Sequence, residues 1–412
     1  MPNGDCHLCP VILDGGTTTT ATDFGYDYCF SFEEWAISNK EKIKKIQKSF
    51  IQAGSEIILT PTIGANPMKL AENGLQEKCV HFNRELCKIT LEAVAESGKS
   101  VQIAGDIGPS GMLVDPFCEI TFSEKINQYK KQVDALEPYV DLFFVETMTT
   151  MSDMRAAALA CRETGKPVFV CISVDSDGNT FEQNIPAKAA LITLQTLGVS
   201  AFGINCSSHN ATLKTIRELL PYAEIPLIAK PAYFSCNDCT NGKISGFDAK
   251  TANLELISCG VKYIGGCCGS TAEDIAELTG YKNYKSNVPL YTEKEDLTFI
   301  FTFINQVFYL EPDTTEISKP IPCFPDMEDI ITEICHQSFD ILRVAVNTED
   351  DALDFSRNAH MSTLPVMFIS DSEVALEKAL LLYQGRALVD SMSAVPEENL
   401  KEIALKYGAV LY

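Results

Sequence analysis

The chain contains no long apolar run and no basic segment at its start. Among its 412 residues, no stretch approaches the roughly 20 apolar residues that a membrane-spanning helix needs. No positively charged region followed by an apolar one opens the chain, as it would in a secretory signal peptide. The sequence therefore predicts a soluble, cytoplasmic protein that does not insert into a membrane.

Basic residues are scarce as well. The chain has 33 Lys and Arg against 56 Asp and Glu, which gives a net charge of −23. A field of this sign repels phosphate backbones, so nucleic acid is excluded as a partner. The hydrophobic content of 46% is ample for a packed core, and the length allows two domains or one large barrel with an appendage.

The first two-thirds of the chain alternates strand-like apolar runs with amphipathic helical segments. A doubly wound open sheet would carry a glycine-rich phosphate-binding turn after its first strand, and Asp14-Gly15-Gly16-Thr17 does not have that pattern. Eight strands, each followed by a helix, predict a closed parallel (β/α)8 TIM barrel over residues 1–285. The predicted strands are Pro10–Leu13, Glu56–Leu59, Val101–Ala104, Leu142–Val145, Pro167–Ile172, Ala201–Ile204, Pro226–Ala229 and Lys262–Ile264.

The barrel pattern stops near residue 285. A proline-containing stretch, residues 286–325, is predicted to be a linker. From residue 326 to 412 the αβ alternation returns, and too few strands remain to close a second barrel. The sequence predicts a smaller, partial α/β domain here, with strands Asp340–Val346, Pro365–Ile369, Ala387–Val389 and Ala409–Leu411.

Polar residues cluster where the predicted barrel strands end. In (β/α)8 barrels the active site lies at the C-terminal ends of the strands. Helix caps also fall at such junctions, and this alternative stays open for Asp106 and Ser173 in particular. The residues at these ends are Asp14, Thr60, Asp106, Glu146, Ser173, Cys206, Cys267 and Cys268.

Two adjacent cysteines, Cys267 and Cys268, stand between glycines in Gly265-Gly266-Cys-Cys-Gly269. Consecutive side chains on a strand point to opposite faces, so both can reach one point only if the backbone leaves strand geometry, which the glycines permit. Cys206 occupies an equivalent strand end upstream. Buried cysteines are often inert, but three thiolates at strand ends suit a Zn²⁺ ion with an open fourth position. We therefore predict Zn²⁺ bound by these three cysteines.

Two further cysteine pairs have CxxC spacing, namely Cys6 with Cys9 and Cys236 with Cys239. Together they could form a second zinc site, or each could be incidental in a chain of 16 cysteines, because neither pair has the usual glycine-rich context. His209, three residues after Cys206, is expected to be a solvent-facing residue at a helix start rather than a ligand.

These motifs resemble those of the homocysteine S-methyltransferase family, which includes the homocysteine module of cobalamin-dependent methionine synthase and betaine–homocysteine methyltransferase. The resemblance runs from about Val11 to Tyr281. Besides Asn205-Cys206 and the double cysteine, it rests on Asp14-Gly15-Gly16-Thr17, Ala53–Thr60, Gly105-Asp106-Ile107-Gly108-Pro109 and Val145-Glu146-Thr147.

The resemblance implies an enzyme that methylates the thiol of homocysteine to give methionine. It assigns zinc to the three cysteines, and it implies that Asp14 and Glu146 hold the substrate ammonium group. The backbone N–H groups of Gly15, Gly16 and Thr17 would then suit the substrate carboxylate.

One departure concerns the end of the seventh strand. The family carries Pro-Asn-Ala-Gly there, whereas this chain has Lys230-Pro231-Ala232-Tyr233. Another small thiol therefore stays open as the substrate. A methyl-corrinoid protein is the leading methyl donor, and S-methylmethionine, betaine and other methylated small molecules stay open. A non-catalytic zinc protein that serves as a docking platform is the alternative of a different class.

The tail resembles part of the pterin-binding barrel of methionine synthase. Polar residues that a pterin requires are replaced by Arg343, Ala345, Ile369 and Asp390. Buried, unmatched polar groups are costly, so we predict that the tail does not bind methyltetrahydrofolate. Its open sheet edges instead predict association, either with a methyl-carrying protein or with a second copy in a homo-oligomer.

Overall fold

The computed structural model describes residues 9–29, 31–112, 120–233, 249–284, 294–311 and 314–412. The described residues form two compact units. The second unit takes Lys188–Gly198 and Glu295–Tyr412, together with residues 120–122, and the first takes the rest. The two units therefore cannot be separated at one position of the sequence, because the internal segment Lys188–Gly198 belongs to the C-terminal unit.

The first unit is built on eight parallel strands in the order β1-β8-β7-β6-β5-β4-β3-β2. The strands are β1 (Val11–Ile12), β2 (Ile57–Leu59), β3 (Gln102–Ile107), β4 (Leu142–Met148), β5 (Val168–Ile172), β6 (Ala201–Asn205), β7 (Leu227–Lys230) and β8 (Tyr263–Ile264). At the seam between β1 and β2, the Glu56 N–H donates to the Ile12 carbonyl at 2.7 Å. This nearly closed ring confirms the predicted (β/α)8 barrel.

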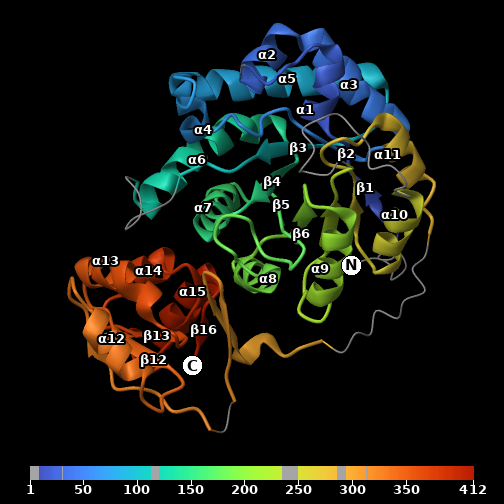
Figure 1. Cartoon of the computed structure of the whole chain (residues 1–412). Coiled ribbons are helices and arrows are strands. Elements are labelled where there is room, and N and C mark those ends of the chain that lie inside the picture. Colours follow the sequence, from blue (N-terminus) through green and yellow to red (C-terminus); the bar gives the residue numbers. More distant parts are fainter. Residues whose placement is uncertain (1–8, 30, 113–119, 234–248, 285–293, 312–313) are drawn as a thin grey trace. The chain divides into compact units, whose positions relative to one another are not determined.

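Helices follow the strands and form the outer layer of this unit (Figure 1). No helix in the described part of the chain is long and apolar enough to cross a membrane. The helices of this unit are α1 (Thr17–Thr20), α2 (Phe32–Ser38), α3 (Lys40–Ala53), α4 (Pro67–Ala71), α5 (Cys79–Ser97), α6 (Phe122–Leu136), α7 (Met151–Arg162), α9 (His209–Leu219), α10 (Ala249–Ser258) and α11 (Ala272–Thr279), while α8 (Ala187–Thr196) is assigned almost entirely to the second unit. Asn39 separates α2 from α3, because its backbone leaves helical geometry there.

Apolar side chains fill the interior of the barrel. Each strand places alternate residues inward, as the two-residue period of a strand requires. The inward residues form one buried cluster that contains Leu13, Ile57, Leu59, Ala104, Leu142, Phe144, Phe169, Cys171, Ala201 and Ile228. The packed interior leaves the C-terminal ends of the strands as the place where polar groups can gather.

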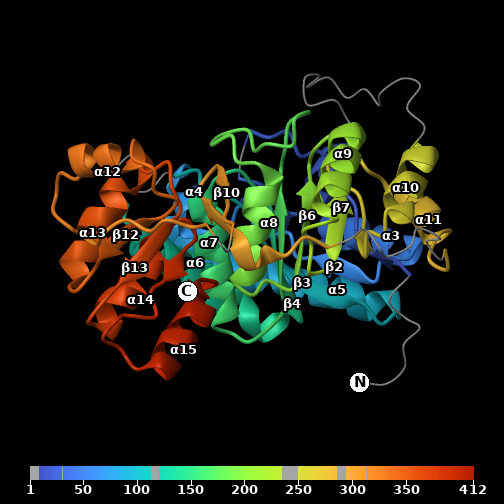
Figure 2. The same ribbon diagram turned by 90° about the horizontal axis from the view of Figure 1, so that it is seen from below.

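The C-terminal unit contains a parallel sheet of five strands and an antiparallel sheet of three. The parallel order is β11 (Ile321–Pro322), β12 (Leu342–Ala345), β13 (Val366–Ile369), β15 (Leu388–Val389) and β16 (Val410–Leu411), with helices α12 (Glu328–Cys335), α13 (Glu349–Asn358), α14 (Glu373–Leu382) and α15 (Glu397–Tyr407). These elements run from orange to red in Figure 2. All four strands predicted in the tail are present, in an open sheet.

The stretch predicted as a linker contains a β-hairpin that the sequence analysis missed. Strands β9 (Ile300–Phe303) and β10 (Gln306–Tyr309) pair with each other, and β9 also pairs with β14 (Gly385–Arg386). Pro320 and Pro325 lie outside these strands, and Pro322 lies on the edge strand β11, where a missing N–H is tolerated. These prolines therefore lie outside the strands or on an edge strand, and they do not prevent strands from forming in this region.

Helix α8 belongs to the C-terminal unit although it lies between β5 and β6 in the sequence. The hydroxyl of Thr193 on α8 forms a hydrogen bond of 2.7 Å with the hydroxyl of Thr302 on β9, and both residues are buried. A Cβ atom at Gly408 would lie 2.7 Å from the carbonyl carbon of Thr196, and Gly408 has a φ of +72°. Glycine at position 408 thus permits both the turn after α15 and its close approach to α8.

Candidate metal and substrate site

The thiols of Cys206, Cys267 and Cys268 converge at the C-terminal ends of β6 and β8. Their sulfur atoms all lie within 4.8 Å of one another, and the Sγ atoms of Cys206 and Cys268 are 3.4 Å apart. The structure thus brings together the three cysteines that the sequence singled out.

Local backbone geometry makes this convergence possible. Cys206 follows β6 with a φ of +52°, a conformation that turns its side chain out of the strand pattern. The Cys267 N–H donates to the Pro231 carbonyl at 2.9 Å, and the Cys268 carbonyl accepts from the Tyr233 N–H at 2.8 Å. A Cβ atom at Gly266 would lie 2.2 Å from Ser270 Oγ, so only glycine fits before the pair.

The electrostatics of the three thiols fit a bound cation. The pKa of the Cys206 thiol is held well above its ordinary value by its hydrogen bonds to the other two thiols. The hydrogen bond with Cys206 lowers the pKa of Cys267, but the hydrogen bond with Cys268 and burial together outweigh it and raise this pKa to about 12. Three thiolates so close together repel one another unless a cation lies among them, and this donor set matches the preference of Zn²⁺.

Beside the thiols lies a buried acidic wall, formed by the carboxylates of Asp14, Asp106 and Glu146, and Lys230 lies among them. The Asp14 Oδ1 is 3.1 Å from Lys230 Nζ, and its Oδ2 accepts from the Leu59 N–H at 2.9 Å. The Glu146 Oε2 lies 3.6 Å from the same Nζ. The Lys230 side chain is 3% exposed, so this ammonium group is a built-in countercharge for both carboxylates.

Burial and the charges of neighbouring groups shift the pKa values of Glu146, Asp106 and Lys230. Burial raises the pKa of Glu146 to about 7, although Lys230 opposes the change. Burial, followed by the charge of Glu146, raises the pKa of Asp106 well above its usual value. Burial alone would lower the pKa of Lys230, but Asp14 and Glu146 raise it above the ordinary value, so the lysine is charged.

Asn205 fixes the position of Glu146. The register between β4 and β5 shifts at Glu146-Thr147, and Thr147 has a φ of +62°, which is unusual for a β-branched residue. The Asn205 Oδ1 accepts from the Thr147 N–H at 2.9 Å, while its Nδ2 donates to Glu146 Oε2 at 3.2 Å. Sequence analysis noted Asn205 only as the residue before Cys206 and missed this contact.

The thiols and the acidic wall share one cavity of about 290 Å³ with the turn after β1. In that turn the Gly16 N–H donates to Ser270 Oγ at 3.0 Å, so one of the three N–H groups predicted for a carboxylate already has a partner. The predicted site residues on the cavity wall are Asp14, Gly15, Gly16, Thr17, Glu146, Cys206, Cys267 and Cys268, and Asp106 and Lys230 join them there.

Three other expectations met different outcomes. His209 is buried, and its Nε2 lies 3.2 Å from Asn253 Oδ1, so the prediction that it faces solvent is wrong. Its burial lowers the histidine pKa to about 4. The Ser173 hydroxyl donates a hydrogen bond to the Cys206 carbonyl at 3.4 Å and so supports the backbone at this cysteine. Of the two CxxC pairs, Cys6 and the Cys236–Cys239 pair lie outside the described residues.

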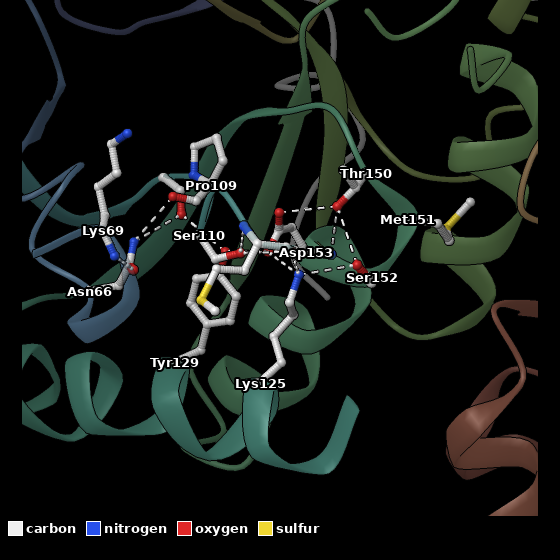
Figure 3. Close-up of polar contacts among 12 residues, drawn as sticks. Asn66, Lys69, Pro109, Ser110, Lys125, Tyr129, Thr150, Met151, Ser152 and Asp153 are labelled. Atoms are coloured by element: carbon white, nitrogen blue, oxygen red, sulfur yellow. Dashed lines mark hydrogen bonds and ion pairs between the residues drawn. The ribbon is translucent and has the colours of Figure 1, made fainter. Parts of the chain in front are cut away.

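A buried ion pair stabilises the loops beyond β3 and β4. Lys125 on α6 lies 3.0 Å from Asp153 on α7, and Ser110 and Tyr129 donate hydrogen bonds to the same carboxylate oxygen at 2.6 and 2.9 Å (Figure 3). Thr150 donates to the other oxygen at 3.0 Å. The contacts of Ser110, Lys125 and Tyr129 with Asp153 join the loop after β3 and α6 to α7, so the network anchors the segment that follows Asp106.

In the C-terminal unit, two of the residues that the sequence comparison predicted to stand in place of pterin-binding groups pair with each other. Arg343 on β12 and Asp390 after β15 form an ion pair, and their side chains are 17% and 7% exposed. The Asp390 Oδ1 also accepts from the Met392 N–H at 2.7 Å. The two charges are therefore engaged with protein partners.

Comparison with known proteins identifies relatives for both parts of the chain. The sequence model of the homocysteine S-methyltransferase family matches residues 11–281. Homocysteine S-methyltransferase 1 of Saccharomyces cerevisiae is 27% identical, covering 65% of this chain and 92% of the yeast protein. Betaine–homocysteine S-methyltransferase 1 of Mus musculus is 26% identical, covering 66% and 73%.

Two further comparisons concern the tail and the fold. Methionine synthase of Mycobacterium tuberculosis is 22% identical, and the match covers 85% of this chain but 32% of that protein. The solved structure of the metallated homocysteine methyltransferase MmuM from Escherichia coli matches with a TM-score of 0.56 and 22% identity, covering 66% of this chain and 96% of that one. This structural likeness supports the fold of the first unit.

Proposed function

Because the chain belongs to the homocysteine S-methyltransferase family, we propose that it is a zinc-dependent enzyme that methylates the thiol of homocysteine to give methionine. The observation that carries the proposal is the convergence of three cysteine thiols on a cavity with an acidic wall. A thiol-binding metal and a site for an amino group thus lie within one small space.

Different residues of the protein would bind the thiol end and the ammonium group of the substrate. Cys206, Cys267 and Cys268 would hold Zn²⁺. When bound, this ion would keep a substrate thiol deprotonated at neutral pH, where a free thiol with a pKa of about 8.5 is mostly protonated. The acidic wall, which contains Asp14 and Glu146, suits the substrate ammonium group, and Asn205 holds Glu146 in place.

The turn after β1 would bind the other charged group of the amino acid. The backbone N–H groups of Gly15 and Thr17 are proposed to receive the substrate carboxylate, and Gly16 shapes the turn. A Cβ atom at Gly16 would lie 2.6 Å from the Cys267 carbonyl oxygen, so a side chain there would separate this turn from the cysteine loop. The substrate sulfur would then attack the methyl carbon of the donor in line with the bond that breaks.

We propose a methyl-corrinoid protein as the methyl donor. The match to a methionine synthase extends over 85% of this chain and so includes much of the C-terminal unit. The pairing of Arg343 with Asp390 supports a tail that does not bind a pterin and that instead associates with the donor protein or with a second copy of the chain. Betaine is the alternative donor that the name of a relative supports.

A panel of methyl donors tests the proposal. The full-length, zinc-loaded protein is mixed with homocysteine and, in separate reactions, with a methyl-corrinoid protein, free methylcobalamin, S-methylmethionine or betaine, and methionine formation is measured. We expect methionine with one donor class, and none from a Cys206→Ser variant. Wild-type protein that binds zinc but forms no methionine with any donor would favour the non-catalytic docking function.

A further inference from the structure

The four residues that end β7 and follow it, 230–233, join the two loops that carry the cysteines. The Lys230 carbonyl accepts from the Cys206 N–H at 3.1 Å, and the Ala232 N–H donates to the Ser207 carbonyl at 2.8 Å. The other two residues make backbone hydrogen bonds to the double cysteine, at 2.9 and 2.8 Å. Residues 230–233, here called the bridging segment, are therefore bonded alternately to the loop after β6 and to the loop after β8.

The side chain of Tyr233 anchors the end of the bridging segment. Its hydroxyl accepts a hydrogen bond from Asn253 Nδ2 on α10 at 3.0 Å, and the tyrosine is 4% exposed. A Cβ atom at Gly266 would lie 3.4 Å from the Tyr233 Cε2, so the tyrosine ring packs against the backbone directly before Cys267. One side chain thus connects the bridging segment both to α10 and to the loop after β8.

Asn253 also connects α10 to the start of α9, which follows Cys206. The Asn253 Oδ1 lies 3.2 Å from the Nε2 of His209, the first residue of α9, and both side chains are buried. The imidazole ring meets the ring of Tyr233 edge to face, with the ring centroids 5.0 Å apart. The three side chains therefore contact one another in a closed network that ties α9 and α10 to the bridging segment.

The geometry of the three thiols depends on where the bridging segment lies. Cys206 follows β6, whereas the double cysteine follows β8, and β7 lies between these strands in the sheet. A shift of the bridging segment would change the separation of the sulfur atoms, because this segment is hydrogen-bonded to both loops. Groups that hold metal ligands in place commonly contribute about tenfold to a hundredfold to the metal affinity.

We propose that Tyr233, Asn253 and His209 are positioning residues of the zinc site, which hold the bridging segment and so keep Cys206 close to the double cysteine. The inference rests on the proposed function, because it presupposes the metal. None of the three side chains is among the described residues that line the cavity, so they act through the cysteines and do not touch the substrate. The network thereby gives a role to the buried histidine and to the stretch that departs from the family pattern.

Metal binding by two variants of the full-length protein tests this role. Zinc affinity is measured by competition with a chromophoric chelator, and Co²⁺ in place of zinc gives an absorption spectrum that reports the arrangement of the thiolates. We expect the zinc affinity to fall by about twofold to tenfold in Tyr233→Phe, which loses one neutral hydrogen bond. In Asn253→Ala the fall should be about tenfold to a hundredfold, with a changed Co²⁺ spectrum, because α9 and the bridging segment lose their common partner.

Tyr129→Phe is the matched control. Tyr129 is also buried, and its hydroxyl donates to Asp153 at 2.9 Å, but it lies on α6, which follows β3, whereas the cysteines follow β6 and β8. This variant should lower the urea midpoint of the zinc-free protein at least as much as Tyr233→Phe does, with the zinc affinity and the Co²⁺ spectrum unchanged.

Two results would overturn the inference and leave the proposed function intact. One is zinc binding as tight as in the wild type in both Tyr233→Phe and Asn253→Ala, with the wild-type Co²⁺ spectrum. The other is an equal loss of zinc affinity in Tyr129→Phe, which would show that any buried hydroxyl has this effect. A wild-type protein that binds neither zinc nor Co²⁺ would overturn both the inference and the proposed function.

Discussion

Replacing Lys230 by methionine removes the only cation that contacts both Asp14 and Glu146 within the described residues, while it keeps a side chain of similar length. The Lys230 ammonium lies 3.1 Å from Asp14 and 3.6 Å from Glu146, and all three side chains are less than 10% exposed. At an effective dielectric constant of about 20, each attraction amounts to about 5 kcal/mol, which desolvation of the three groups largely offsets.

The net effect follows from what the substitution leaves behind. Two carboxylates would stay buried beside one another without their countercharge, and breaking a buried pair in this way costs about 3–5 kcal/mol. Part of that cost should disappear in the double variant Lys230→Met/Asp14→Asn, because one unpaired carboxylate is then neutral. We expect a coupling energy of about 1–3 kcal/mol between the two positions.

Urea unfolding followed by circular dichroism measures all four proteins of this double-mutant cycle. Lys88→Met is the control, since Lys88 pairs with Glu85 on the exposed face of α5 and should change the unfolding free energy far less. A Lys230→Met protein as stable as the wild type, or a coupling energy below about 0.5 kcal/mol, would show that Lys230 is not the countercharge described here.

Three further predictions concern the metal, the histidine and the tail. Elemental analysis should find one zinc per wild-type chain and a large loss in Cys206→Ala, and full zinc content in that variant would contradict the ligand set. Because the pKa of buried His209 falls from 6.5 to about 4, the unfolded chain binds more protons between these values, so the unfolding free energy should drop by about 3 kcal/mol from pH 6.5 to pH 4. Stepped-pH urea unfolding should show this drop in the wild type and a smaller one in His209→Asn. Equilibrium dialysis should detect no binding of methyltetrahydrofolate to the full chain, and micromolar binding would contradict the role given to the Arg343–Asp390 pair.

Much of the barrel could be predicted because the apolar runs have a simple period. All eight strands of the first unit overlap the predicted ones, since most of these apolar runs are buried along nearly their whole length. The convergence of Cys206 with Cys267 and Cys268 followed from their places at strand ends. Parallel strands bring these ends to one side of the barrel whatever the lengths of the connecting helices are.

Contacts between side chains on strands that are far apart in the chain could not be predicted from the sequence. Lys230 and Asp14 are 216 residues apart, and nothing local distinguishes a buried lysine from an exposed one. Lys230, the last residue of β7, was visible in the sequence as part of a departure from the family pattern, but its partner Asp14 was not. His209 has the sequence position of a helix-start residue, yet packing against Tyr233 and Asn253 buries it. The hairpin of β9 and β10 was hidden by the neighbouring prolines.

The membership of Lys188–Gly198 in the C-terminal unit has a consequence for how the chain can be shortened. A stop codon near Tyr281 would remove Thr302 and leave the buried hydroxyl of Thr193 without that partner. The truncated product would therefore contain a helix whose own unit is missing, and it should expose apolar surface and be prone to aggregation and proteolysis. Gene truncation or a single-cut expression fragment cannot separate these two units cleanly, and the tail is expected to be inherited together with the barrel.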